Sequence, residues 1–403
     1  MWGKRMFTSA KRRSERKARC KSRLLQAAGA AIPMFLAASG AHAIDFEDGA
    51  VSVNATYVVD YSAALAGATS YSGNVMHNLL VSGSADLERL GGPGVNVYGS
   101  VLTNAGGKAN NAAGTLQGVD NIEVAQASTR LFELWAETDL AGVGTRAGLY
   151  DLNSEFYSTP TAALFLAPAF GIGSELSSTG PNGPSIFPST ALAMRARTQL
   201  SPVLTFKFAV LDAKAGVLGD PGGVDVSFKH GVLFISELEW EGFVHASAGA
   251  WHYSRKQEDI ANPAERKAAY GAYISVERPL WGNEHTSFSG TGFLRAGMSD
   301  GDTTPFNGGW QAGLLLNRVL PGRPNSTVAF GVFQGRLGAK EKDDLRNNGI
   351  QASSSETGFE LTASDQVTPW LRIQPDIQVI HNPNADGSRN DAWVATLRAA
   401  FTL

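Results

Sequence analysis

The chain has 403 residues, of which 43% are apolar and 18% charged, with 45 glycines and one cysteine. The sequence contains no run of about 18 apolar residues, which excludes a membrane protein built from apolar helices. The share of apolar residues is also too high for an intrinsically disordered chain. The net charge of −3 hides an imbalance, because the first 43 residues hold ten Lys and Arg and a single acid, Glu15. The acidic remainder argues against nucleic acid as a partner, since phosphate binding needs a basic surface.

Residues 1–43 have the order of a secretory signal peptide. A basic run, Lys4–Arg23, precedes an apolar stretch, Leu24–Ala38, and Ala41–Ala43 offers the small side chains of a cleavage site. The only cysteine lies in this segment. We therefore expect residues 44–403 to form one exported domain without disulfides or thiolate ligands.

A period of two residues dominates the rest of the chain, which indicates β-strands rather than helices. In the segment Ala392–Leu403, Trp393 and Leu397 share one face, while Thr396 and Arg398 share the other. Sixteen segments have this pattern, and their lengths suit strands that cross a membrane at a tilt. They begin near Ala50, Val75, Gly94, Thr129, Val143, Thr190, Val203, His230, Phe243, Ala269, Thr286, Gly309, Ser326, Thr357, Trp370 and Ala392.

The connections between these segments alternate between short and long. Residues 139–142 and 201–202 form short turns, whereas residues 62–74 and 104–128 form long loops. Outer-membrane barrels have this rhythm, with short turns on one side and long loops on the other. A closed barrel also pairs every backbone group in lipid, with an apolar outer face and a polar lumen. We therefore predict an all-β fold, a closed antiparallel transmembrane β-barrel of about 16 strands. A soluble β-sandwich would also alternate, but it would not explain the loop rhythm.

The longest connection, Asp151–Ser189, is the third loop on the long side. It contains an apolar stretch, Ala162–Phe170, that has nothing to bury against if the loop stands in solvent. Because loops of this length are usually functional, we predict that it folds into the lumen and narrows it. The alternative is a flap that packs on neighbouring loops.

Several segments resemble the OprB family of carbohydrate-selective porins. They are Leu131–Trp135, Arg146–Phe156 (RAGLYDLNSEF), Gly180–Pro188, and Gln366–Trp370 followed by Ile373–Asp376. The resemblance implies a sixteen-stranded barrel in the bacterial outer membrane, surrounded by its lipid, through which sugars such as glucose diffuse passively. The sequence leaves open whether the barrel is a monomer or a trimer.

Candidate pore-lining residues gather around the fifth segment and the loop after it. Guanidinium and ammonium groups donate hydrogen bonds to sugar hydroxyls, and carboxylates and amides accept them. Trp135 and Tyr150 would stack on the apolar face of a sugar, whereas Phe132 is assigned to the lipid-facing side. For each charged residue the alternative is a solvated or mutually paired luminal side chain. The candidates are Glu133, Trp135, Arg146, Tyr150, Asp151, Asn153, Glu155, Arg195, Arg197 and Lys207.

Other chemistry has little support in the sequence. The seven histidines lack a metal-binding spacing, and His245 and His252 would lie on opposite faces of a strand. We therefore expect no enzyme, no cofactor and no metal site. Tryptophans at strand ends are expected at the membrane interfaces; they are Trp240, Trp251, Trp281, Trp310, Trp370 and Trp393.

The pattern thus predicts a passive outer-membrane channel for mono- or disaccharides. The alternatives are a general diffusion porin of the same fold, an outer-membrane enzyme, and a secreted β-sandwich lectin.

Overall fold

The computed structural model describes residues 44–46 and 49–402, which belong to one compact unit. The predicted signal peptide, residues 1–43, lies outside the described residues. Among those that are described, no helix is both long enough and apolar enough to cross a membrane.

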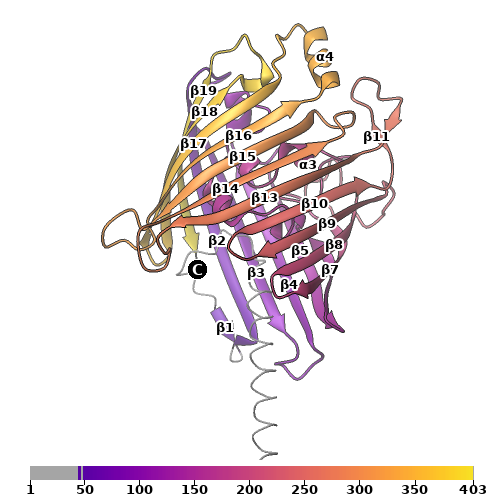
Figure 1. Cartoon of the computed structure of the whole chain (residues 1–403), viewed down its shortest axis with the longest axis vertical. Helices are drawn as coiled ribbons and strands as arrows, with labels where there is room; N and C mark the ends of the chain where they lie inside the picture. The colour runs from indigo at the N-terminus through magenta and orange to yellow at the C-terminus, as the bar shows by residue number, and fades with distance from the viewer. Residues whose placement is uncertain (1–43, 47–48, 403) are drawn as a thin grey trace, which may run out of the picture. The chain divides into compact units, whose positions relative to one another are not determined.

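Sixteen strands form a closed antiparallel barrel, as the alternation predicted (Figure 1). Each strand pairs with its neighbours in sequence, and the last strand pairs with β2 to close the ring. No strand of the ring has a free edge, so its backbone groups are paired without water, as a membrane requires. The strands are β2 (Val51–Ala66), β3 (Asn74–Asp86), β4 (Val95–Gly106), β5 (Ser128–Leu140), β6 (Val143–Tyr150), β7 (Ala191–Ser201), β8 (Leu204–Asp212), β9 (Val232–Glu241), β10 (His245–Tyr253), β13 (Tyr270–Trp281), β14 (Ser289–Ser299), β15 (Phe306–Asn317), β16 (Thr327–Leu337), β17 (Ser355–Thr368), β18 (Leu371–His381) and β19 (Ala392–Thr402).

A short strand, β1 (Ile44–Phe46), extends the seam of the barrel. The pairing of β19 with β2 ends at Thr402 and Thr56, and β1 pairs with the earlier residues Val51–Val53 of β2. The sequence analysis did not predict β1.

The observed strands begin within three residues of the predicted starts. The largest differences are at β14 and β15, which begin at Ser289 and Phe306. The first long loop is shorter than expected, residues 67–73, because β2 continues to Ala66.

The two faces of the strands differ as the alternation predicted. On β19, Leu397 is 51% exposed on the outer face, while Arg398 is 3% exposed on the inner face. Trp251 corrects one expectation, because it is not at a membrane interface. It shares the inward face of β10 with His245, is 3% exposed, and packs edge-on against Tyr253.

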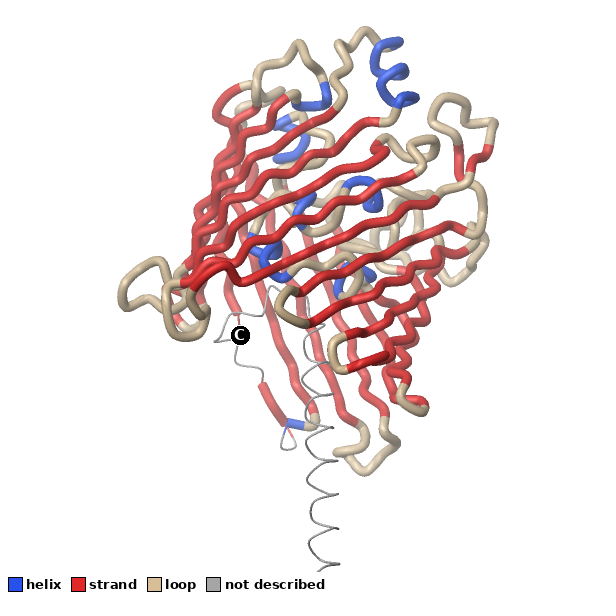
Figure 2. Tube along the Cα trace, viewed as in Figure 1, coloured by secondary structure: helices blue, strands red, loops and turns tan. Residues whose placement is uncertain are grey.

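Short helices lie in the loops, several of them inside the ring of strands (Figure 2). The long third loop therefore brings its own secondary structure into the lumen. The helices are α2 (Ala109–Ala113), η3 (Leu152–Ser154), η4 (Pro160–Leu164), η5 (Pro168–Phe170), α3 (Ser174–Ser177), α4 (Ala339–Asn347) and η6 (Pro383–Ala385), and a small separate hairpin is formed by β11 (Gln257–Glu258) and β12 (Arg266–Lys267).

Candidate functional site

The third loop, residues 151–190, folds into the lumen, as predicted from its apolar stretch. Leu166 and Ala167 are fully buried, and Phe165 and Phe170 stack on each other with ring centroids 4.1 Å apart. Phe170 also packs edge-on against Phe333 from the wall, at 5.3 Å. The apolar stretch therefore forms a core with inward side chains of the barrel instead of facing water.

Four charged side chains fix the start of this loop to the wall. Arg146 on β6 and Arg195 on β7 face each other in the strand register, and both bind the carboxylates of Glu137 and Glu155. Arg146 Nε lies 2.7 Å from Glu137 Oε2, and Arg195 Nε lies 2.7 Å from Glu155 Oε2. Because Glu137 belongs to the wall and Glu155 to the loop, each arginine joins the two.

Lys207 on β8 extends this cluster. Its Nζ atom donates to the backbone carbonyl of Glu155 at 2.7 Å and pairs with Glu237 Oε1 at 2.5 Å. Glu237 in turn accepts hydrogen bonds from the backbone N–H of Tyr157 and from the hydroxyl of Tyr273. The cluster therefore binds the loop at two points, Glu155 and Tyr157.

Trp135 on β5 contacts side chains from both neighbouring strands. Its ring stacks on Tyr98 from β4 at 5.0 Å, and the Arg146 guanidinium from β6 lies 3.7 Å from its centroid. Tyr150, the other predicted stacking residue, is 1% exposed. A sugar therefore has no free face of the Tyr150 ring to stack on, and Trp135 is only partly exposed.

A register shift in β5 corrects the prediction for Phe132. Ser100 of β4 pairs with Glu133, but the next residue, Val101, pairs with Leu131. Phe132 is therefore an extra residue in β5. Its ring is 4% exposed and packs on Phe187 of the third loop at 6.4 Å. Phe132 therefore contacts the loop instead of facing lipid, because a bulge breaks the strict alternation.

The far wall holds the middle of the loop. Glu360 on β17 accepts hydrogen bonds from the backbone N–H groups of Leu166 and Ala167, at 2.5 and 3.0 Å. Arg295 on β14, which is fully buried, donates to the carbonyl of Ala169 at 2.7 Å. The loop is thus held at both sides of the lumen by charged groups that satisfy its backbone.

The second long loop, residues 107–127, also enters the lumen, which the sequence analysis did not predict. The backbone N–H groups of Leu116 and Gln117 donate to Glu356 on β17, and Asn121 accepts from Arg398 on β19. Burial and the nearby Asp60 carboxylate raise the pKa of Asp120 in this loop.

The loop carboxyls near the arginine cluster have opposite pKa shifts. Burial alone would raise the pKa of Glu155, but Arg146, Arg195 and Lys207 lower it to about 2. Burial and the charge of Glu133 raise the pKa of Asp151. The cations are thus matched to Glu155, which stays ionised at neutral pH.

Most predicted candidates point inward or belong to the loop, but loop and wall cover them. Arg146, Arg195 and Lys207 are at most 4% exposed, and Asn153 donates to the carbonyl of Phe156 in its own loop. Among the candidates, only Trp135, Asn153 and Arg197 are partly exposed; the buried ones are Glu133, Arg146, Tyr150, Asp151, Glu155, Arg195 and Lys207.

The water-exposed part of the wall lies toward the short-turn end. The side chain of Arg197 is 31% exposed, that of His245 is 28%, and those of Glu137 and Glu239 are 17% and 14%. The sequence analysis selected Arg197 as a candidate, but not His245 or Glu239. The same inward parity on β9 and β10 could have identified them.

A polar lumen narrowed by an inserted loop is the geometry of a porin. The sequence profile described as "Carbohydrate-selective porin, OprB family" matches residues 72–403. The chain belongs to the OprB family. Family and fold together indicate a porin channel rather than an enzyme, and they imply the outer membrane.

Solved structures share the fold of this OprB-family porin at low sequence identity. The high-pH structure of Pseudomonas putida OprB matches with a TM-score of 0.78 and 17% identity, covering 88% of this chain and 94% of that one. The low-pH structure of the same protein gives 0.57 and 13%, covering 88% and 93%. An engineered Rhodopseudomonas blastica porin gives 0.51 and 11%, covering 88% and 100%.

A curated relative matches a smaller part of this OprB-family chain. The Acinetobacter baylyi protein named "Putative porin QuiX" is 30% identical over 115 residues. This match spans 25% of the present chain and 26% of the relative.

Proposed function

We propose that this porin passes mono- and disaccharides such as glucose across the bacterial outer membrane, after export with a cleaved signal peptide. The observation that carries the proposal is the fixed third loop beside a wall that exposes donors and acceptors together. A neutral sugar needs both kinds of group, because each hydroxyl donates and accepts.

The candidate residues divide into two roles. Arg197, Glu137 and the exposed edge of Trp135 contact the passing sugar, with Glu239 as an additional acceptor. Arg146, Arg195, Glu155 and Lys207 act through the loop and hold it at a fixed distance from that wall. This division follows exposure, since a side chain that is 1–6% exposed offers little surface to a solute.

Contacts of this kind favour passage over retention. Arg197 lies 3.9 Å from Glu239, so its charge is partly balanced within the protein. A conducting site must bind its solute weakly enough to release it. Hydrogen bonds to partly balanced, hydrated groups meet that requirement.

Liposome swelling with a panel of sugars tests the proposal. Small neutral sugars are expected to enter faster than amino acids of similar size, and glucose is expected to reduce ion current through single channels in a planar bilayer. Swelling rates that depend on solute size alone, together with no glucose effect on the current, would show a general diffusion porin instead.

Substitutions on the two faces of β7 test the assigned roles. Arg197→Gln is expected to weaken the glucose block several-fold. Met194→Ala is the matched control, because Met194 is 62% exposed on the outer face of the same strand and is expected to change nothing. A glucose block that is equal in both variants would remove Arg197 from the sugar path. The native mass of the same preparation distinguishes a monomer from a trimer.

A further inference from the structure

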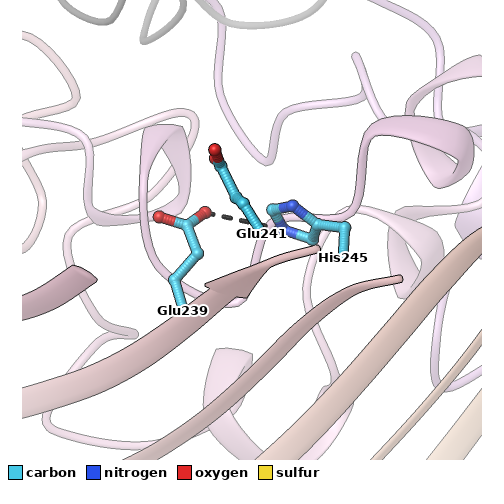
Figure 3. Close-up of side chains that lie close together, drawn as sticks. All are labelled: Glu239, Glu241 and His245. Carbon is cyan, nitrogen blue, oxygen red and sulfur yellow. Dashed lines mark ion pairs between the residues drawn. The ribbon is translucent and has the colours of Figure 1, made fainter. Parts of the chain in front are cut away.

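Three potential metal ligands meet on the inner face of the β9–β10 hairpin, near its short turn (Figure 3). They are Glu239, Glu241 and His245, and one ligand atom from each lies within 4.8 Å of the other two. The strand register places His245 opposite Glu241, and Glu239 shares the inward face of β9 with Glu241. His245 Nε2 lies 3.5 Å from Glu239 Oε1.

A buried hydroxyl without a partner lies next to these groups. Ser247 is 7% exposed, and its Oγ atom has no hydrogen-bond partner among the described residues. It lies opposite Glu239 in the register and two residues from His245, on the same inward face. A buried hydroxyl normally has a partner, so this atom is available to a bound ion or to water on that ion.

The surrounding charges favour a cation. Lys207 and Arg197 are the cations near Glu239, and both approach its Oε2 atom, at 3.5 and 3.9 Å. Lys207 is already paired more closely with Glu237. Glu277 on β13 lies opposite His245 on its other side. The carboxylates of Glu237, Glu239, Glu241 and Glu277 therefore face two cations, Lys207 and Arg197. Glu239 Oε1 is the oxygen that points to the imidazole of His245.

We propose that Glu239, Glu241 and His245 bind one divalent transition-metal ion, of the zinc, cobalt or nickel type. Imidazole with carboxylates suits these metals better than calcium or magnesium, which prefer oxygen ligands alone. A tetrahedral zinc ion with bonds of about 2.0–2.2 Å holds its ligand atoms roughly 3.3–3.6 Å apart. The observed separation between His245 and Glu239 already has this value.

Because the site faces the lumen, its ion would keep an open position for water. Binding adds two positive charges to an exposed part of the wall. The bound metal therefore lowers the current of small cations through the pore. This inference concerns a binding site and does not depend on which solute the porin selects.

Zinc titration of the intact porin tests the proposal. The detergent-solubilised protein is treated with a chelator, dialysed and titrated with zinc chloride in a calorimeter. One ion per chain is expected, with at least tenfold weaker binding in His245→Ala and Glu241→Gln. Glu241 is exposed, so Glu241→Gln is expected to fold normally. It therefore still tests the site if His245→Ala fails to fold.

His285→Ala is the matched control. His285 lies 3.6 Å from Glu284 in a short turn, and its side chain is 82% exposed. It belongs to no group of three potential ligands among the described residues, so the variant is expected to bind zinc as the wild type does. Equal zinc affinity in His245→Ala and the wild type would overturn the proposal, and so would the absence of zinc binding at submillimolar concentration.

Single-channel recording gives a second measurement. Zinc added to the wild type is expected to reduce the cation current, chelator is expected to restore it, and His245→Ala is expected to abolish the effect. A zinc effect that persists unchanged in His245→Ala would contradict the assigned ligands, even if glucose block is normal.

Discussion

At the scale of residues, the arginine pair explains why buried charge is tolerated in the lumen. Arg146 and Arg195 face each other across two strands, an arrangement that is repulsive by itself. Glu137 lies within 2.8 Å of both guanidinium groups, and Glu155 binds both as well. Each carboxylate therefore offsets the repulsion, and the loss of any one member leaves a buried charge without balance.

Arg195 and Arg197 are neighbours on one face of β7 but are expected to respond differently to substitution. Arg195→Met removes one of the two guanidinium groups that balance Glu137 and Glu155. It is expected to lower the free energy of unfolding by roughly 3–5 kcal/mol. Arg197→Gln removes a partly exposed charge, so stability is expected to stay within about 1 kcal/mol while ion preference shifts toward cations. The temperature of the gel-mobility shift in detergent measures stability, and the reversal potential in a salt gradient measures selectivity. A stability loss of similar size in both variants would contradict this division.

Glu155 is expected to make the inserted loop sensitive to acid. Its pKa is about 2 in the folded porin and about 4.3 in an unfolded chain. The stabilisation from this depressed pKa is therefore fully present above about pH 5 and is lost as the pH falls toward 2. Glu155→Gln is expected to lower stability at pH 7 and to flatten the decline below pH 5. The mobility-shift temperature, measured from pH 7 to pH 2.5, provides the test, and equal slopes in the variant and the wild type would refute it.

At the scale of elements, the strands and the entry of the third loop into the lumen could be predicted from sequence, whereas the bulge in β5 and the entry of the second loop could not. Lipid outside and water inside impose a period of two, which is why Leu397 and Arg398 could be assigned to opposite faces. The bulge at Phe132 has no such signal. The entry of residues 107–127 into the lumen depends on partners far away in sequence, such as Glu356. Alternation assigns Glu356 to the luminal face but does not predict which loop residue it binds.

The third loop is expected to loosen when its anchor on the far wall is changed. Glu360→Gln replaces an oxygen that accepts from Leu166 or Ala167 with an amide that donates, so at least one backbone N–H loses its partner. Single-channel conductance is expected to rise and the current to become noisier. Phe359→Leu is the control, because Phe359 is 42% exposed on the outer face of β17. Identical conductance and noise in Glu360→Gln and the wild type would mean that the aromatic core alone holds the loop.

At the scale of the whole molecule, the candidate site could be located from sequence but its roles could not be assigned. Parity assigned Arg146 and Arg195 to the inner face of the wall, where the structure also has them. Exposure depends on what packs over that wall, and this is a property of the closed barrel with both loops inside. Sequence reasoning therefore treated buried loop anchors and exposed groups such as Arg197 as one set.

The closure of the barrel is expected to depend on one ion pair across its seam. Arg398 on β19 binds Asp60 on β2 through two atoms, with Nε–Oδ1 at 2.8 Å and Nη2–Oδ2 at 2.6 Å. These are the last and first strands of the ring, so this pair joins the two ends of the chain. The same guanidinium donates to Asn121 of the second loop.

Arg398→Met would leave the buried carboxylates of Asp60 and Asp120 without this cation, at a cost of roughly 3–5 kcal/mol. The mobility-shift temperature is expected to fall clearly, whereas Leu397→Ala on the outer face should change it little. The double variant Asp60→Asn with Arg398→Met is expected to recover part of the loss, because it removes one unbalanced charge. If the double variant is less stable than Arg398→Met by the full cost of Asp60→Asn alone, the two side chains are not coupled, and the seam is held by backbone pairing alone.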